Sequence, residues 1–330
     1  MPWKSCLLWL LAIIAWQSQG DSIAHAAGAE AKAIHLPAQT TRVSKGTLVE
    51  IRHFASHYFQ PRQVQVWLPP GYRQKQQQGR QYAVLYMHDG QMLFDADTTW
   101  NRQEWGVDET ASLLQSAPGI KDFIVVGIFN GGADRHSEYF PQKPFMSLPD
   151  KTRTALYRAK RHKGEKLFSR PVNSDAYLKF IVDELKPYID QHFAVKTDRE
   201  NTVIMGSSMG GLISLYALVE YPEIFGGAGC LSTHWPGIMP SDDNPVPERF
   251  YAYLKQYLPE GETHKFYFDY GSETLDAFYP PLQQQVDKIM QSKGYNSRHW
   301  LTKKFAGAGH NEDAWRSRLH IPLRFLLAKR

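Results

Sequence analysis

The chain has 330 residues, of which 42% are hydrophobic and 22% are charged, a balance that is typical of a globular protein and excludes a largely disordered one. The 38 Lys and Arg residues exceed the 33 Asp and Glu residues by only five, which is too small an excess at this length to indicate a nucleic-acid-binding protein. The two cysteines, Cys6 and Cys230, exclude a disulfide framework and a zinc site built from cysteines.

The N-terminus has the pattern of a secretory signal peptide. Lys4 precedes an apolar run of 11 residues, Cys6–Trp16, which is about half the length that spans a membrane. The segment Ala24–Ala26 then supplies a small-x-small cleavage pattern. We therefore expect residues 1–26 to be removed during export, which would leave a periplasmic or secreted protein without stable membrane insertion. An N-terminal anchor that is not cleaved is the alternative.

Residues 27–45 are small and polar, and we expect them to form a loose lead-in. From residue 46 to residue 330, apolar runs alternate with helical patterns, which predicts a single α/β domain with a mostly parallel sheet and helices on both faces. The first two strands are expected to form a hairpin. The expected strands are Thr47–His53, Gln63–Leu68, Tyr82–His88, Phe123–Phe129, Thr202–Gly206, Gly227–Leu231, Lys265–Tyr270 and His299–Phe305. The expected helices are Gln103–Gln115, Asp175–His192, Leu212–Glu220, Pro281–Lys293 and Glu312–Leu327.

A long stretch without a clear periodic pattern, residues 130–171, interrupts this alternation. Loops of that length inside a compact domain usually serve as lids or binding loops. The second half of the stretch, Arg153–Arg170, contains seven Lys or Arg residues and one acid, Glu165. This basic segment would either attract anionic substrates toward the site or form a solvated helix face that points away from it.

The motif that indicates chemistry is Gly206-Ser-Ser-Met-Gly210, which has the form G-x-S-x-G. A short apolar strand precedes the motif and an amphipathic helix follows it, as a serine nucleophile on a strained turn requires. Glycines two residues before and after the serine leave room for that turn. We therefore expect Ser208 to be the nucleophile and the Met209 amide to be one oxyanion donor. The alternative is an ordinary turn that joins a strand to a helix.

The serine needs a base and an acid. Among 13 histidines, His310 follows the last expected strand and precedes the last helix, at the edge of the sheet where the sites of open α/β proteins gather. Glu273 and Asp276 follow the strand before it, and either could orient the imidazole. The loop after the third strand should supply the second oxyanion donor, and we expect this to be the Gln91 amide.

These motifs make the chain similar to the esterase family of the α/β-hydrolases, which includes enterochelin esterases, feruloyl esterases, S-formylglutathione hydrolases and mycolyltransferases. The resemblance extends over about residues 45–328 and is carried by Val66–Tyr72, Leu85–Phe94, Trp105–Glu109, Phe129–Arg135, Gly206–Gly211 and Tyr270–Asp276. It implies an α/β-hydrolase fold with Ser208 as nucleophile and His310 as base. It also favours Asp276 over Glu273 as the acid, because of the spacing between Asp276 and the next helix.

The resemblance further implies a substrate floor built from the regions of Gln91, Trp105 and Arg135. Together with Trp105, the aromatic residues Trp100, Tyr139 and Trp235 are expected around the mouth and would suit a ring-shaped acyl group. The alternative is that most of these aromatics belong to the core. Arg135 would either contact the substrate or pair with Glu138.

The sequence therefore predicts an exported serine esterase that acts on a small-molecule ester, such as an enterochelin-type siderophore or an aromatic acyl ester. It contains no H-E-x-x-H motif, no convincing cysteine and histidine cluster and no phosphate-binding loop, so we expect no metal and no cofactor. An acyltransferase with the same triad and a non-catalytic binding protein on the same fold are the alternatives. The sequence does not indicate an oligomeric state.

Overall fold

The computed structural model describes residues 41–161 and 164–329, all of which belong to one compact unit. The expected signal peptide and most of the lead-in lie outside the described residues, as do His162 and Lys163 of the basic segment. Within the described residues, no helix is both long enough and apolar enough to cross a membrane.

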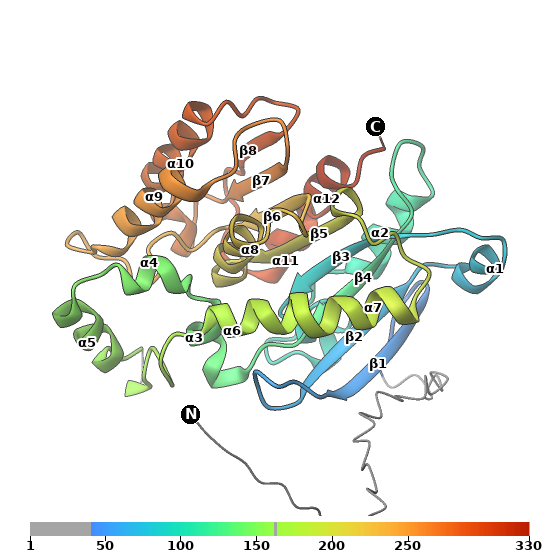
Figure 1. Cartoon of the computed structure of the whole chain (residues 1–330), viewed down its shortest axis with the longest axis horizontal. Helices are drawn as coiled ribbons and strands as arrows, with labels where there is room; N and C mark the ends of the chain where they lie inside the picture. The colour runs from blue at the N-terminus through green and yellow to red at the C-terminus, as the bar shows by residue number, and fades with distance from the viewer. Residues whose placement is uncertain (1–40, 162–163, 330) are drawn as a thin grey trace, which may run out of the picture. The chain divides into compact units, whose positions relative to one another are not determined.

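A single sheet of eight strands forms the centre of the described residues (Figure 1). Its strand order is β1-β2-β4-β3-β5-β6-β7-β8. The strands β1 and β2 are antiparallel, as are β2 and β4, and every other neighbouring pair is parallel. The strand bounds are β1 (Thr47–Phe54), β2 (Arg62–Leu68), β3 (Ala83–His88), β4 (Phe123–Ile128), β5 (Thr202–Ser207), β6 (Gly227–Leu231), β7 (Lys265–Tyr270) and β8 (Trp300–Lys304). The expected sheet and its opening hairpin are confirmed, and each strand end lies within one residue of the prediction.

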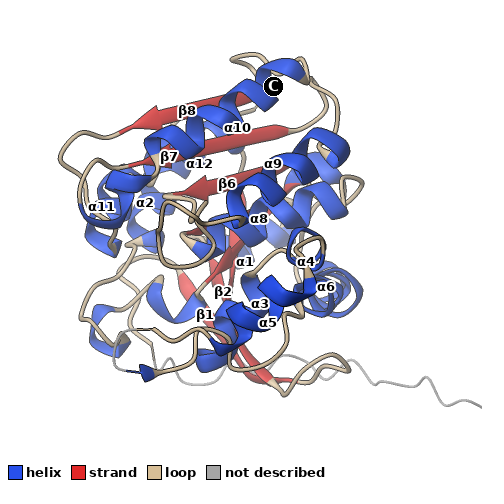
Figure 2. Ribbon diagram, turned by 90° about the vertical axis from the view of Figure 1, so that its left-hand side faces the viewer, coloured by secondary structure: helices blue, strands red, loops and turns tan. Residues whose placement is uncertain are grey.

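Helices cover both faces of this sheet. On one face, Leu114 of α2 and Trp315 of α11 share a core cluster with Leu85 of β3. On the other face, Tyr177 of α6 contacts His88 of β3, and Figure 2 shows these helices around the strands. All residues of the central strands β3, β4 and β5 are buried, which explains why their sequences are apolar runs without alternation. The helix bounds are α1 (Tyr72–Gln77), α2 (Val107–Gln115), α3 (Arg135–Tyr139), α4 (Gln142–Met146), α5 (Asp150–Arg158), α6 (Ser174–Lys179), α7 (Lys186–His192), α8 (Met209–Glu220), α9 (Val246–Tyr257), α10 (Pro280–Ser292), α11 (Glu312–Arg318) and α12 (His320–Leu326).

The five expected helices are present, and two of them are interrupted. A π-helical segment, Phe180–Leu185, separates α6 from α7 just before Pro187. The last expected helix is divided into α11 and α12 at Leu319, three residues before Pro322. Both interruptions follow from proline, which has no backbone N–H and disturbs the preceding helical turn.

The stretch 130–171 differs from the sequence prediction because it contains the helices α3, α4 and α5. These helices are five to nine residues long, so their own helix propensity contributes little and tertiary packing stabilises them. An aromatic cluster supplies that packing: Phe145 lies 5.2 Å from Phe140 and 5.4 Å from Phe168 between ring centroids. The basic segment thus begins inside α5, where Arg153 donates to the backbone oxygens of Met146 and Leu148.

Candidate active site

The expected nucleophile lies on a strained turn between β5 and α8. Ser208 has φ 58° and ψ −123°, a backbone conformation that a residue with a side chain adopts only when its surroundings enforce it. A Cβ atom at Gly206 would lie 2.9 Å from the carbonyl carbon of Gly210, so the turn closes only because residue 206 is glycine. The turn presents a half-buried Ser208 at the carboxyl edge of the sheet.

The amides of Met209 and Gln91 are the two backbone groups that the sequence predicts as oxyanion donors. Met209 is the first residue of α8, where the helix dipole favours negative charge. Gln91 lies in a short 3-10 helix, Gly90–Met92, directly after β3. Among the described residues, neither amide donates a hydrogen bond. The two loops touch, because a Cβ atom at Gly210 would lie 3.4 Å from Asp89 Oδ2 and 3.5 Å from His88 Cβ.

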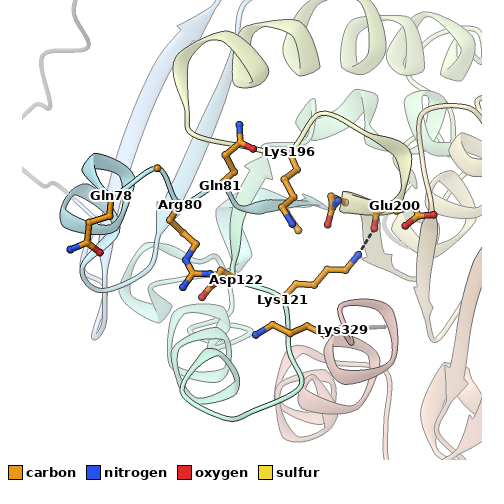
Figure 3. A pocket seen from close by; sticks show the side chains of 11 residues that line it. Gln78, Arg80, Gln81, Lys121, Asp122, Lys196, Glu200 and Lys329 are labelled. Carbon is orange, nitrogen blue, oxygen red and sulfur yellow. Dashed lines mark hydrogen bonds and ion pairs between the residues drawn. The ribbon is translucent and has the colours of Figure 1, made fainter.

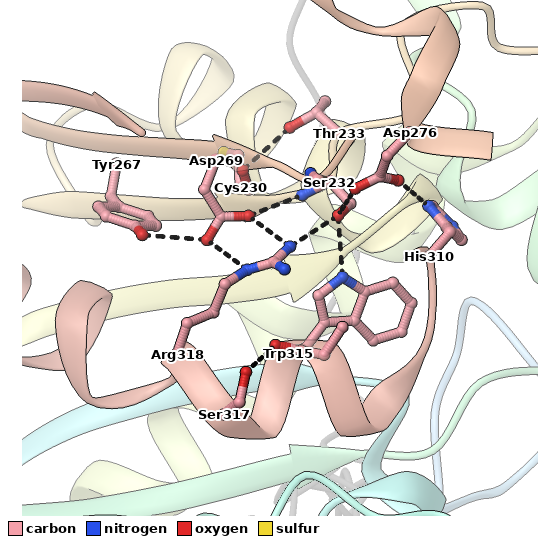
Figure 4. A network of polar contacts seen from close by, with 12 residues as sticks. Cys230, Ser232, Thr233, Tyr267, Asp269, Asp276, His310, Trp315, Ser317 and Arg318 are labelled. Atoms are coloured by element: carbon pink, nitrogen blue, oxygen red, sulfur yellow. Dashed lines mark hydrogen bonds and ion pairs between the residues drawn. The ribbon is translucent and has the colours of Figure 1, made fainter. Parts of the chain in front are cut away.

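The acid that contacts His310 is Asp276. The distance from His310 Nδ1 to Asp276 Oδ1 is 2.6 Å (Figure 4). Glu273 remains exposed, and its carboxylate accepts a hydrogen bond from its neighbour Ser272. The His310 amide donates to Thr274 Oγ1 at 2.9 Å, which fixes the histidine loop to the acid loop. The structure therefore brings Asp276, and not Glu273, to the imidazole.

Asp276 is held as an anion. Burial would raise the pKa of this carboxyl group, but the hydrogen bonds from His310, Ser232 and Gly271 outweigh burial and lower the pKa below its usual value. Ser232 Oγ and the Gly271 amide each donate to Asp276 Oδ2 at 2.6 Å. An ionised Asp276 favours the imidazole tautomer that carries its proton on Nδ1, so His310 Nε2 is left to accept a proton from a nucleophile.

The loop that follows β6 contacts both the Ser208 turn and the residues around His310, at the carboxyl edge of the sheet. The Ser208 amide donates to the backbone oxygen of Leu231, and the His234 amide donates to the backbone oxygen of Ser208. His234 Nδ1 lies 2.9 Å from the hydroxyl of Tyr279, whose ring centroid is 5.9 Å from that of His310. No hydrogen bond joins Ser208 Oγ to His310 within the part of the chain that the structure describes. Catalytic hydrogen bonds of this kind often tighten only when substrate binds.

Arg135 supports the loop that carries the Gln91 amide. Its Nε and one terminal nitrogen donate to the two carboxylate oxygens of Asp89 at 2.7 and 2.8 Å. Burial would raise the pKa of Asp89, but Arg135 outweighs burial and lowers it. The alternative partner, Glu138, instead binds Arg62 at 2.7 Å, so a pair between Arg135 and Glu138 is excluded. Arg135 is partly exposed, and it lies over the ring of Tyr139 at 5.0 Å.

Three of the residues predicted to bind substrate are buried in the core. Trp105 packs on Trp315 with 5.4 Å between ring centroids. Tyr139 packs on Tyr177 at 5.2 Å. Trp235 donates through its indole N–H to Gln283 Oε1 at 2.8 Å. The expectation that these aromatics line the mouth is therefore corrected, because large rings gain more from burial than from exposure at a rim.

Two other aromatic side chains are exposed on segments that adjoin the residues around His310 and Asp276. Trp100 is 84% exposed and Phe278 is 56% exposed. The neighbour of Trp100, Asn101, donates to Glu312 Oε2 at 2.8 Å, which holds this loop beside the start of α11, two residues after His310. Phe278 lies two residues after Asp276 in the same 3-10 helix. The sequence predicts Trp100 near the mouth but carries no such signal for Phe278, since only exposure distinguishes that residue from a core phenylalanine.

A hollow lies at the amino ends of β3, β4 and β5, whereas Ser208 follows the carboxyl end of β5. The hollow has a volume of about 740 Å³ and is lined by polar side chains that include Arg80, Lys121 and Lys196 (Figure 3). Lys121 donates to the backbone oxygen of Glu200 at 2.6 Å. None of the predicted site residues lines this hollow. Among residues 41–161 and 164–329, no group of three or more His, Cys, Asp or Glu side chains could hold a metal ion.

Curated relatives match part of the chain. The uncharacterized protein YbbA of Bacillus subtilis is 29% identical over 192 residues, which are 58% of this chain and 62% of YbbA. An endo-1,4-beta-xylanase/feruloyl esterase of Xylanibacter ruminicola is 28% identical, over 58% of this chain and 22% of that protein. The ferri-bacillibactin esterase BesA of Bacillus subtilis is 25% identical, over 49% of this chain and 53% of BesA. The chain thus spans less than two thirds of the length of each of these relatives.

Solved structures share the fold, and a family profile identifies the chain. The enterobactin esterase FES of Shigella flexneri, solved with enterobactin, has a TM-score of 0.61 and 17% identity over 87% of this chain and 60% of that chain. The ferulic acid esterase AmCE1/Fae1A of Anaeromyces mucronatus has a TM-score of 0.56 and 19% identity over 88% of this chain and 93% of that chain. These similarities confirm the expected α/β-hydrolase fold. The profile of the family described as "Putative esterase" matches residues 56–326, and the chain therefore belongs to this esterase family.

Proposed function

We propose that the protein is a serine esterase that hydrolyses a carboxylic ester through an acyl-enzyme. Ser208 is the nucleophile, His310 is the base and Asp276 is the acid of this proposed triad. The observation that carries the proposal is the 2.6 Å hydrogen bond between His310 and Asp276, which lies at the same sheet edge as the strained serine turn. Membership of the esterase family supports it.

The reaction follows from this arrangement. Ser208 Oγ attacks the ester carbonyl carbon while His310 Nε2 takes the hydroxyl proton. The carbonyl oxygen becomes an oxyanion, which the Met209 and Gln91 amides bind. The intermediate collapses as the bond to the alcohol oxygen breaks, and His310 returns its proton to the leaving alcohol. Water then attacks the acyl-enzyme by the same steps, which release the acid and restore Ser208.

The substrate that we propose is an ester of a ring-bearing acid. The side chains of Trp100 and Phe278 offer exposed aromatic faces on segments that adjoin the proposed base and acid, and such faces bind planar rings. The names of two relatives, a feruloyl esterase and a ferri-bacillibactin esterase, support the same direction. The positive charge of the basic segment would in addition attract anionic esters. Increasing salt concentration should then lower kcat/KM for an anionic ester more than for a neutral one, because salt screens exposed charges.

We also propose that the protein is exported. The positive start, short apolar run and Ala24–Ala26 pattern support cleavage near Ala27. N-terminal sequencing of the protein from the periplasm of a Gram-negative host tests this, and a protein that begins at Met1 in the membrane fraction would contradict it.

Labelling with a fluorophosphonate probe tests the proposed nucleophile. The probe forms a stable bond to a serine that a neighbouring base activates. We expect peptide mapping to locate the probe on Ser208, and Ser208→Ala to abolish labelling while the circular dichroism spectrum is unchanged. The matched control is Ser207→Ala, which removes the adjacent buried hydroxyl and should leave the label in place. If the probe does not label the wild-type protein, the result would instead indicate a non-catalytic binding protein on this fold.

A further inference from the structure

A buried polar network lies beneath the proposed acid and is not used by the triad chemistry itself. Ser232 is at its centre, directly after β6, and its hydroxyl lies 2.6 Å from Asp276 Oδ2 (Figure 4). The indole N–H of Trp315 donates to the same hydroxyl at 2.9 Å, and Arg318 donates to it at 3.0 Å. The side chains of Ser232, Asp276, Trp315 and Arg318 are all buried.

These contacts fix the direction of the Ser232 hydroxyl proton. An indole N–H and a guanidinium N–H can only donate hydrogen bonds, and a hydroxyl oxygen has two acceptor positions. Trp315 and Arg318 fill both positions. The Ser232 proton must therefore point to Asp276 Oδ2, which as a carboxylate oxygen can only accept.

Arg318 is itself held in place by a second buried carboxylate. Its Nε and one terminal nitrogen donate to Asp269 at 3.2 and 3.0 Å. The Tyr267 hydroxyl also donates to Asp269, at 3.0 Å. The charges of Arg318 and Asp269 offset one another, so the guanidinium supports Asp276 through the Ser232 hydroxyl without forming an ion pair with it.

The backbone of Ser232 indicates that a side chain is required at this position. Ser232 has φ 40°, a left-handed value that glycine adopts much more readily than serine. The strained backbone is held by a hydrogen bond from the Ser232 amide to the backbone oxygen of Asp269 at 2.9 Å. A residue that is kept in such a conformation, although glycine would fit it better, points to a need for its hydroxyl.

We infer that Ser232 is a positioning residue for the triad acid, an inference that rests on the proposed function. Its hydroxyl keeps Asp276 ionised and turned so that Oδ1 faces His310 Nδ1, while Oδ2 is occupied by Ser232 and Gly271. The titratable and charged groups that face Ser232 and Asp276 are His310, Tyr279, Asp269 and Arg318. Tyr267 contacts Asp269 in turn.

The test compares Ser232→Ala with Ser232→Gly. Both variants remove the hydroxyl. Glycine adopts the left-handed backbone of residue 232 more readily than alanine does, so Ser232→Gly can be measured even if Ser232→Ala does not fold. With the amount of active enzyme counted by fluorophosphonate labelling, we expect kcat to fall about 10- to 100-fold with little change in KM, as for the loss of one hydrogen bond to a charged group. We also expect the acid limb of the kcat/KM profile to move to higher pH, because the Asp276 carboxylate with one donor fewer interacts more strongly with the protonated imidazole and so favours the inactive form of the base.

The matched control is Thr233→Val, which removes the neighbouring buried hydroxyl. That hydroxyl donates to the backbone oxygen of Cys230 at 3.1 Å, so the variant should keep the wild-type pH profile. If both Ser232 variants lose stability but keep the wild-type kcat and pH profile per labelled site, Ser232 only stabilises the fold and the inference is wrong. A wild-type protein that neither binds the probe nor hydrolyses esters would instead overturn the proposed function.

Discussion

Asp276 links the proposed chemistry to the buried interior, because one of its oxygens contacts His310 and the other contacts Ser232 and Gly271. We expect Asp276→Asn to lower the turnover of a p-nitrophenyl ester by about three to four orders of magnitude, since an amide favours the wrong imidazole tautomer. Glu273→Gln should lower it less than threefold, because the Glu273 carboxylate contacts Ser272 and not the imidazole. A larger loss for Glu273→Gln would assign the acid role to that residue.

The motif around Ser208 could be predicted from sequence because its geometry is local. Gly206 and Gly210 meet across one turn, and the strand and helix that surround the turn have their own apolar patterns. Asp276 is favoured over Glu273 in the sequence only through the spacing that the family resemblance implies, because the contact itself depends on how the loop folds against His310. The contacts of Ser232 with Trp315 and Arg318 join residues more than 80 positions apart, so no local sequence pattern predicts this network.

Among the elements, the strands were predicted well and several helices were not. Buried strands such as β4 have continuous apolar runs that few other structures produce. The helices α3, α4 and α5 are short, and they form because aromatic side chains such as Phe140 and Phe145 pack between them and the rest of the domain. These helices are stabilised by contacts between residues that are distant in sequence. Residues 130–171 therefore show no helical pattern of their own, and the sequence predicts an irregular stretch there.

The loops that hold Trp100 and Phe278 give a prediction about specificity. Replacing both residues by alanine should raise KM for a feruloyl ester about tenfold or more, because two exposed aromatic faces are lost, and should leave acetyl ester turnover nearly unchanged. The control is Tyr257→Ala in α9, which removes an aromatic side chain that is 48% exposed on a helix that carries none of the proposed site residues. Equal effects on the feruloyl and acetyl esters would show that these loops do not recognise the ring.

For the domain as a unit, the buried carboxylates at the site link stability to pH. The pKa of Asp276 is lowered in the folded protein, below an unfolded value of about 3.9. The stabilisation is therefore present above about pH 4 and is lost as the pH falls through the folded pKa. Urea unfolding between pH 7 and pH 2.5 should show a smaller loss of stability at low pH for Asp276→Asn than for the wild type. Parallel curves for the two proteins would contradict this linkage.

The arrangement of the sheet places the whole proposed reaction at one edge. The strands β3, β5 and β7 end in the Gln91 loop, the Ser208 turn and the Asp276 loop, and His310 follows β8. Because β3, β5, β6, β7 and β8 run parallel, their carboxyl ends meet at the same edge.

The central claim is that Ser208, activated by His310 and Asp276, forms an acyl-enzyme with a carboxylic ester. The most direct measurement is the pre-steady-state release of p-nitrophenol from p-nitrophenyl acetate, together with the mass of the acid-quenched protein. We expect a burst of about one equivalent per labelled site and an added acetyl group on the peptide that contains Ser208, and neither with Ser208→Ala. Ester hydrolysis that continues at the wild-type rate in Ser208→Ala, or an acetyl group on another residue, would contradict the claim.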